Sequence, residues 1–139
     1  MSNNLHTPSE QVKTAPGFAA AITAAATNGA SVDCQGFETG KAIFNSAPTG
    51  AGTTSDCKLQ ESDDNAAWAD VPSASFAQAT TAGGAKIQVM NIKLSNRKRY
   101  LRLVHTGAGG SAAGQTYGLI ELYNARYNPV QQTNPAISV

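Results

Sequence analysis

The sequence contains few charged side chains. They make up 14% of the 139 residues, and the formal net charge is only +1. A general nucleic-acid-binding protein is normally clearly basic, so this balance argues against direct contact with nucleic acid. Much of the remainder is Gly, Ala, Ser, Thr and Asn. Such a low-charge surface of small residues is typical of secreted β-proteins and of virion proteins whose surfaces face other copies.

Cysteine and histidine are also scarce. Cys34 and Cys57 are too few for a disulfide scaffold. The two histidines, His6 and His105, lie far from both cysteines in the sequence and show no spacing typical of a metal site. We therefore expect two reduced, buried thiols and no metal or other cofactor.

Long apolar runs are missing as well. The alanine-rich run at residues 19–26 is too short and too weakly apolar to span a bilayer. The first residues are polar and lack the cationic and apolar regions of a secretory signal. We expect a protein without a membrane partner that is made and assembled in a cytoplasm.

Strand-forming residues are abundant, and they are densest between Lys86 and Tyr127. Three runs rich in β-branched, aromatic and leucine residues follow one another there, separated by Ser95-Asn96 and by Gly107–Gly110. Apolar runs bounded by turn residues are typical of antiparallel strands. Shorter runs with a similar pattern precede them, at residues 18–26, Ser31–Phe37, Lys41–Ser46, Asp56–Ser62 and Val71–Phe76.

This pattern predicts an all-β protein of about eight strands without amphipathic helices. Regular strand spacing with intervening turn signals favours an antiparallel β-sandwich of the jelly-roll type at residues 17–127. Residues 1–16 form a predicted N-terminal arm, either a disordered terminus or a segment that orders on a neighbouring subunit. Residues 128–139, with Pro129 and Pro135, form a predicted extended tail.

A distinctive turn follows the Asp56–Ser62 run. The segment S-D-D-N-A-A-W, from Ser62 to Trp68, resembles the Asp-box hairpin, although Ala66 stands where the box has glycine. We interpret it as a structural turn held by side-chain hydrogen bonds, with the only Trp packed against it. The alternative is a Ca²⁺ site formed by neighbouring carboxylates, those of Glu61, Asp63, Asp64 and Asp70.

No set of residues typical of a catalytic site is visible, so we do not expect an enzyme. His105 alternates with Leu101 and Leu103 on one face of a strand, which favours a core position over a catalytic base. The glycine-rich Gly107–Gly114 segment lacks the Gly-Lys-Ser/Thr ending of a phosphate-binding loop. It is better explained as a flexible connection between two strands.

Positive charge is concentrated at the start of one predicted strand. If the strand includes these residues, Arg97 and Arg99 share one face, and Lys98 shares the other with Arg102. Two interpretations remain open. The charges form a solvated hairpin end that prevents edge-to-edge aggregation, or they contact an acidic partner surface.

Three segments together carry a family resemblance. C-K-L-Q-E-S-D-D-N-A-A-W-A-D-V, I-K-L-S-N-R-K-R-Y-L-R-L-V and G-L-I-E-L-Y-N-A-R-Y-N-P cover parts of residues 30–130. In their order and spacing they resemble the jelly-roll cement (decoration) proteins of tailed bacteriophages, such as that of the Bordetella podophage.

The resemblance implies a non-enzymatic virion protein on the capsid exterior. Its partners would be the major capsid protein and a second copy in a homodimer. It would cement neighbouring capsomers of an icosahedral shell against the pressure of packaged DNA. The dimer interface would be two-fold and formed by edge strands or by the hydrophobic faces near Tyr117–Tyr123. The residues that we expect at the partner surface are the basic ones, Arg97, Lys98, Arg99, Arg102 and Arg126.

An alternative function is binding to a carbohydrate or to a host surface. The Asp-box-like turn and residues 56–71 favour such a β-sandwich module of a virion. A sugar platform usually needs exposed aromatic rings, and the sequence has one Trp and four Tyr.

Overall fold

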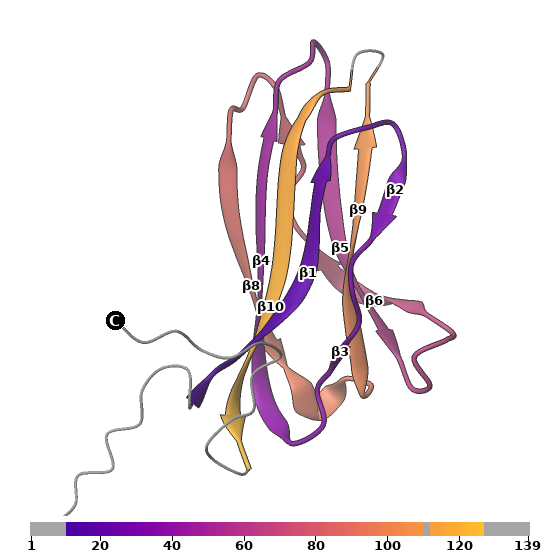
Figure 1. The fold of residues 1–139 in the computed structure, drawn as a ribbon, viewed down its shortest axis with the longest axis vertical. Coiled ribbons are helices and arrows are strands. Elements are labelled where there is room, and N and C mark those ends of the chain that lie inside the picture. Colours follow the sequence, from indigo (N-terminus) through magenta and orange to yellow (C-terminus); the bar gives the residue numbers. More distant parts are fainter. Residues whose placement is uncertain (1–10, 110–111, 127–139) are drawn as a thin grey trace, which may run out of the picture.

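The computed structural model describes residues 11–109 and 112–126, which form two antiparallel β-sheets facing each other (Figure 1). The first sheet has the strand order β1-β10-β4-β8, with bounds Lys13–Ala21, Gly114–Ala125, Phe37–Pro48 and Lys86–Lys93. The second sheet has the order β2-β9-β5-β6, with bounds Ala26–Asn28, Tyr100–Ala108, Thr54–Ser62 and Ala69–Ser75. Two short strands complete it, β3 (Val32–Asp33) on β9 and β7 (Ala79–Thr80) on β5. The prediction of an antiparallel β-sandwich is confirmed, with ten strands in the described residues.

The three runs predicted between Lys86 and Tyr127 form strands β8, β9 and β10. A short 3-10 helix, η1 (Leu94–Asn96), separates the first two. The glycine-rich segment does connect β9 to β10, although residues 110–111 within it lie outside the described part. Since β8 and β10 belong to the first sheet and β9 to the second, the chain crosses between the sheets at both connections.

Three of the predicted strands differ from the structure. The run predicted as one strand at residues 18–26 is divided, since β1 ends at Ala21 and β2 starts at Ala26. The strand predicted at Ser31–Phe37 ends after Asp33, because Gly36 has a φ of +89° and the chain turns back there, with the Phe37 N–H donating to the Cys34 carbonyl at 3.2 Å. Strand β4 then starts at Phe37 and is longer than the predicted Lys41–Ser46.

Strand β1 begins at Lys13, inside the range predicted as an arm. The rest of that arm, residues 1–10, and the predicted tail at 128–139 lie outside the described residues. Within the described part, no helix has the length and apolarity to cross a membrane.

The core lies between the sheets and follows from strand alternation. Phe44 on β4 and Ile120 and Leu122 on β10 point inward from the first sheet, and Leu101 and Leu103 on β9 meet them from the second. Each of these side chains is at most 1% exposed. Because strand side chains alternate with period two, one register sends the intervening residues to the outer faces.

His105 lies inside this core, as the alternation predicted. Its Nε2 atom is 2.8 Å from the Ser55 hydroxyl, which accepts a hydrogen bond from the Ser46 hydroxyl at 2.7 Å. Its ring packs against Phe18 and Phe44, with centroids 5.7 and 6.4 Å away. The Nδ1 atom is buried without a hydrogen-bond partner among the described residues. Burial lowers the pKa of His105, with Asp56 acting weakly in the opposite direction.

Both cysteines are buried free thiols, as predicted. Burial raises the pKa of each thiol to about 12, and Asp33 adds to the effect at Cys34. At neutral pH both are therefore protonated and chemically inert.

The S-D-D-N-A-A-W segment forms the predicted turn between β5 and β6. One carboxylate oxygen of Asp64 accepts hydrogen bonds from the N–H groups of Ala66 and Ala67 and from the Ser62 hydroxyl, each at 2.9 Å. These bonds lower the pKa of Asp64 to about 2. Within this turn the non-glycine residue with positive φ is Asn65, at +60°, a conformation that Asn tolerates. Position 66 therefore does not need the glycine of the Asp box.

The first prediction concerns His105 and pH. Its lowered pKa means that the unfolded chain binds a proton near pH 6.5 before the folded chain does, so stability falls as the pH drops below this value. We expect the free energy of unfolding to fall as the pH is lowered from 7.5 to 5.5, with a slope no steeper than the single-site limit of about 1.4 kcal/mol per pH unit. Chemical denaturation at a series of pH values measures this slope.

The control removes the titrating ring. In His105→Gln the stability should change much less over the same pH range. Asp33, Asp64 and Asp70 have lowered pKa values, so they reduce stability only at more acidic pH, as it falls below about 4. Equal slopes for wild type and His105→Gln would contradict the assignment.

The second prediction concerns the irregular register in β1, between Ala15 and Phe18. A Cβ atom on Gly17 would lie 1.9 Å from the carbonyl oxygen of Gly118 on the neighbouring strand. Because backbone cannot move aside as a side chain does, Gly17→Ala should destabilise the fold by about 1–3 kcal/mol. Gly40→Ala is the matched control, since its nearest contact would be an ordinary 3.5 Å. Thermal unfolding compares the two variants, and equal melting temperatures would be evidence against this packing.

Candidate partner-binding site

A cavity of about 630 Å³ opens at one end of the sandwich. Its walls come from the β3–β4 loop, the start of β4, the end of β8 and the segment around η1. Arg126, which follows β10, completes the lining. The Arg126 N–H donates to the Gly36 carbonyl at 2.9 Å, which holds Arg126 against the β3–β4 loop. We call this site the basic pocket, since its lining has one acidic residue, Glu38, and five basic ones, Lys93, Arg97, Lys98, Arg99 and Arg126.

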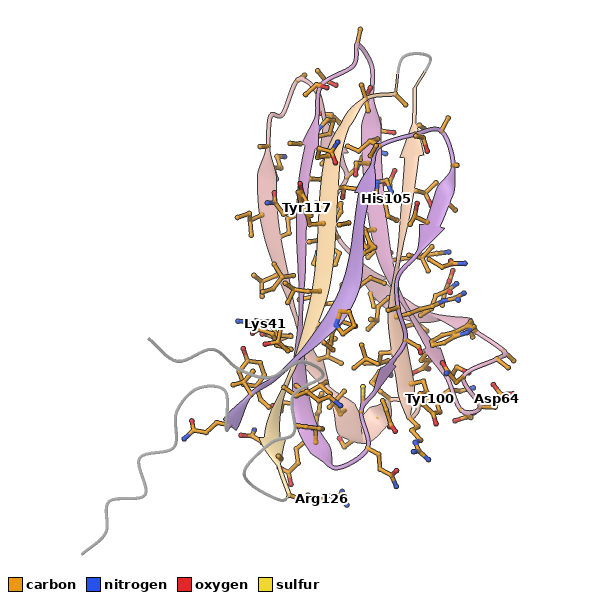
Figure 2. The ribbon with its side chains drawn as sticks, in the orientation of Figure 1. Lys41, Asp64, Tyr100, His105, Tyr117 and Arg126 are labelled. Atoms are coloured by element: carbon orange, nitrogen blue, oxygen red, sulfur yellow. The ribbon has the colours of Figure 1, made fainter. Side chains whose placement is uncertain are left out.

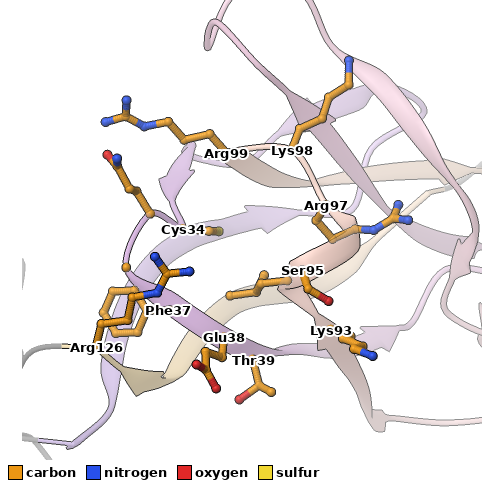
Figure 3. A pocket seen from close by; sticks show the side chains of 13 residues that line it. Cys34, Phe37, Glu38, Thr39, Lys93, Ser95, Arg97, Lys98, Arg99 and Arg126 are labelled. Atoms are coloured by element: carbon orange, nitrogen blue, oxygen red, sulfur yellow. The ribbon is translucent and has the colours of Figure 1, made fainter.

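Four of the five basic residues predicted at a partner surface line this pocket. Arg97, Lys98 and Arg99 reach it from the turn after η1, and Arg126 reaches it from the far end of the sequence (Figure 3). Strand β9 begins only at Tyr100, so the alternation predicted for Arg97–Arg99 does not apply to them. Lys93, at the end of β8, was missed because nothing in the sequence shows that the turn at η1 brings it to the others.

Arg97 and Lys98 are already paired within the subunit. The Arg97 Nη1 atom lies 3.4 Å from a Glu61 carboxylate oxygen, close enough for an ion pair but without a hydrogen bond. The Lys98 ammonium is 2.9 Å from the Asp63 carboxylate, and this contact raises the pKa of Lys98. The Lys98 N–H also donates to Glu61, at 3.1 Å. These contacts attach the turn to the second sheet.

Arg99 is paired with Asp33 in a bidentate arrangement. Its Nε and Nη2 atoms donate to the two carboxylate oxygens at 3.1 and 2.8 Å. The bond from Arg99 lowers the pKa of Asp33, and the same bond raises the pKa of Arg99. Exposed ion pairs of this kind contribute little to stability. Their effect here is to neutralise much of the charge that the sequence indicated.

Lys93 and Arg126 differ from these three, because neither forms an ion pair with any described residue. Figure 3 shows Arg126 on one side of the pocket and Lys93 on another, while the Arg97 side chain points away from Arg126. Within the described part of the chain, the pocket's positive charge without an ion-pair partner is therefore that of these two side chains.

Arg102 does not belong to the pocket. It lies on the outer face of the second sheet, where its Nε and Nη2 atoms donate to the Gln60 side-chain oxygen at 2.9 and 2.8 Å. Its guanidinium also lies 4.4 Å from the ring centroid of Trp68, a cation–π contact. We expected Trp68 to pack against the turn. In the structure its ring contacts Arg102 on the outer surface of the sheet.

The carboxylates considered for a Ca²⁺ site have separate partners. Glu61 and Asp63 pair with Arg97 and Lys98, and Asp64 holds the turn backbone. Asp70 accepts hydrogen bonds from the side chains on β5 that face it. In residues 11–109 and 112–126, no three His, Cys, Asp or Glu side chains are grouped so that they could hold a metal ion.

The comparisons with known proteins agree with the fold. No match was found among curated proteins. Among solved structures, the PBSX exported protein XepA is similar with a TM-score of 0.54 and 19% identity, over 91% of this chain and 42% of that chain. This chain therefore matches less than half the length of XepA, and at this identity the likeness is one of fold. The model of the family Bbp16 matches residues 17–120, which is most of the sandwich. The chain therefore belongs to the phage-associated Bbp16 family.

Proposed function

We propose that the protein is a capsid cement protein. It binds the outside of an icosahedral phage capsid, contacts the major capsid protein and joins neighbouring capsomers, so that the shell resists internal DNA pressure. Membership of a phage-associated family supports a virion-associated role. The observation that carries the finer proposal is the basic pocket, where Lys93 and Arg126 have no ion-pair partner among the described residues.

The position of the chain ends supports the same surface. Strand β1 starts, and β10 finishes, at the end of the sandwich that also holds η1 and the β3–β4 loop (Figure 1). The described part of the chain therefore begins and finishes at the end of the sandwich that carries the basic pocket.

Several weak contacts made together explain how a small domain can hold a shell. Each exposed charge contact contributes little alone. Once one contact forms, the others become intramolecular and act at a high effective concentration. Terminal segments that order on binding lose entropy, yet they bury a large area on several neighbours.

Carbohydrate or host-surface binding is less well supported by the geometry. The only Trp has one ring face occupied by the Arg102 guanidinium. Strand β6, which follows the Asp-box-like turn, directs Asp70 towards Lys58 and Gln60, at 2.8 and 2.7 Å. These side chains satisfy one another and leave no aromatic platform for a sugar at this position.

The proposal predicts that Lys93 and Arg126 govern attachment. The double variant Lys93→Glu/Arg126→Glu should bind capsids that lack the protein at least about tenfold more weakly at physiological salt, because an acidic partner surface then meets negative charge. Wild-type binding should weaken as salt rises. Co-sedimentation of the protein with capsids, over a range of salt concentrations, measures both effects.

Lys86→Glu is the control, because it changes the same kind of charge at the other end of strand β8. It should bind like the wild type. Replacing Arg97, Lys98 and Arg99 is a less clean test, since it leaves three carboxylates without their partners. Binding of the double variant with wild-type affinity would refute the role of the pocket. Capsids that are equally heat-resistant with and without the bound protein would refute cementing.

A further inference from the structure

Strand β8 is an open edge of the first sheet. In the described residues it pairs with β4 alone, along its whole length from Lys86 to Lys93. Its register with β4 has no shift, and it contains no proline. Its central residues, 87–92, carry no charge, since the two lysines are at its ends. A regular, uncharged edge of this kind is a template for the addition of another strand.

The other edges of the sandwich are protected. Strand β1, at the opposite edge of the first sheet, has Pro16 and a register shift between Ala15 and Phe18. Strand β6 lies at the same edge of the sandwich as β8, and it has Pro72, a positive φ at Ser73 and a register shift against β5. Strands β2, β3 and β7 have only three, two and two residues. Proline, bulges and short length all prevent strand addition, so among the described strands β8 is the edge without such protection.

The hydrogen-bond pattern shows which residues of β8 have backbone groups at the open edge. In an antiparallel pair, alternate residues exchange both backbone bonds with the opposite residue, and the residues between them point away. The Thr49 N–H donates to the Ala113 carbonyl at 3.0 Å, and this pair continues the register of β4 with β10. The odd-numbered residues of β4 therefore bind β10, and the even-numbered ones bind β8. Ile87, Val89 and Asn91 are opposite odd-numbered residues of β4, so their N–H and C=O groups point to the open edge.

A side chain of β8 closes the inner side of this edge. Gln88 is opposite the buried Phe44, so it points between the sheets. Its side chain donates to the Ala77 carbonyl at 2.8 Å and accepts from the Ala77 N–H at 2.9 Å. These two bonds connect β8 to the segment between β6 and β7 without using the backbone groups of β8. In residues 11–109 and 112–126 no other strand pairs with β8 on this side.

A groove of about 260 Å³ lies beside the end of this edge. Strand β8 contributes Met90 and Ile92 to its lining, and β6 contributes Val71 and Ala74. Opposite residues of paired strands share a face, so a strand added to β8 directs alternate side chains to the same side as Met90 and Ile92. The groove can therefore receive one apolar side chain of an added strand. Recognition by strand addition combines backbone hydrogen bonds with side-chain pockets of this kind.

Lys93 connects the edge of β8 with the basic pocket. Its side chain lines both the groove and the basic pocket, and it forms no ion pair with a described residue. A segment that follows β8 in either direction has one end beside Lys93. A carboxylate at that end meets an unneutralised positive charge, whereas the rest of the segment faces uncharged residues. The edge therefore favours a segment with negative charge at one end.

We propose that an extended segment of the capsid partner adds to β8 as a fifth strand of the first sheet. The segment covers residues 87–93 of β8, is uncharged opposite Ile87–Asn91, places an apolar side chain in the groove and holds a carboxylate beside Lys93. Ile87, Val89 and Asn91 each offer one donor and one acceptor to its backbone. This inference rests on the proposed function, because it names the element of the partner that the basic pocket receives.

Hydrogen exchange of the full chain, free and bound to capsids that lack the protein, tests the proposal at single residues. On binding, the amides of Ile87, Val89 and Asn91 should exchange at least about tenfold more slowly, because each gains a hydrogen bond. The amides of Gln88 and Met90 should change little, since they already bind β4 in the free protein. Mass spectrometry with residue-level fragmentation measures this alternation.

Val89→Pro removes the central donor of the edge. The Val89 N–H does not bind β4, so proline is tolerated there as at other sheet edges, and the melting temperature checks the fold. The variant should bind capsids at least about tenfold more weakly, because a hydrogen bond is lost and the ring meets the added strand. This factor should be the same at low and high salt, since no charge changes. Val89→Thr is the matched control, because it keeps the N–H and the branched shape, and it should bind like the wild type.

Each outcome decides between alternatives. Alternate protection of β8, with loss of binding in Val89→Pro but not in Val89→Thr, supports the proposal. Capsid binding without slower exchange at Ile87, Val89 and Asn91 overturns it and leaves the proposed function standing. Equal slowing of all β8 amides, or equal weakening by both variants, also overturns it, because the contact is then made by side chains.

Protection of the same three amides in the free protein would show that the edge is already covered. If that protection is independent of protein concentration, residues 1–10 or 127–139 of the same chain cover it, and if it rises with concentration, a second copy does. Either result overturns the proposal. Failure of the wild-type protein to bind capsids at all refutes the proposed function, and this inference with it.

Discussion

The antiparallel pairing of β4 with β10 is the constraint on which the other features depend. Both strands have twelve residues, and they pair from Gly114–Pro48 at one end to Ala125–Phe37 at the other. A shift of one residue would exchange the faces, so that Phe44 would point to solvent. The same register sends Tyr117 and Ile43 outward and brings Arg126 beside the β3–β4 loop. Core and basic pocket are thus two results of one pairing.

Charge in this protein is placed by its internal partners. Most cations of the basic cluster neutralise a nearby carboxylate, so the sequence overstates how much charge is available for binding. The positive charge that remains available for binding depends on where the strands place two residues. Lys93 ends β8 and Arg126 follows β10, and no described acid pairs with either. The positive pocket therefore attracts negative charge at one position of an otherwise weakly charged surface. Such attraction between exposed charges falls off within a Debye length.

Alternation was sufficient to predict the sandwich, the strands β5, β8, β9 and β10, and the inward position of His105. It failed where a single glycine decides the path, as at Gly36, where the positive φ ends a strand that the polar–apolar pattern would continue. The basic residues were recognised from composition, but their assembly was not. The pocket joins residues 34–39, 93–99 and 126, and only the strand order of the first sheet brings these segments together. Similarly, the sequence I-Q-V-M-N-I indicates a strand but not which of its apolar residues face solvent.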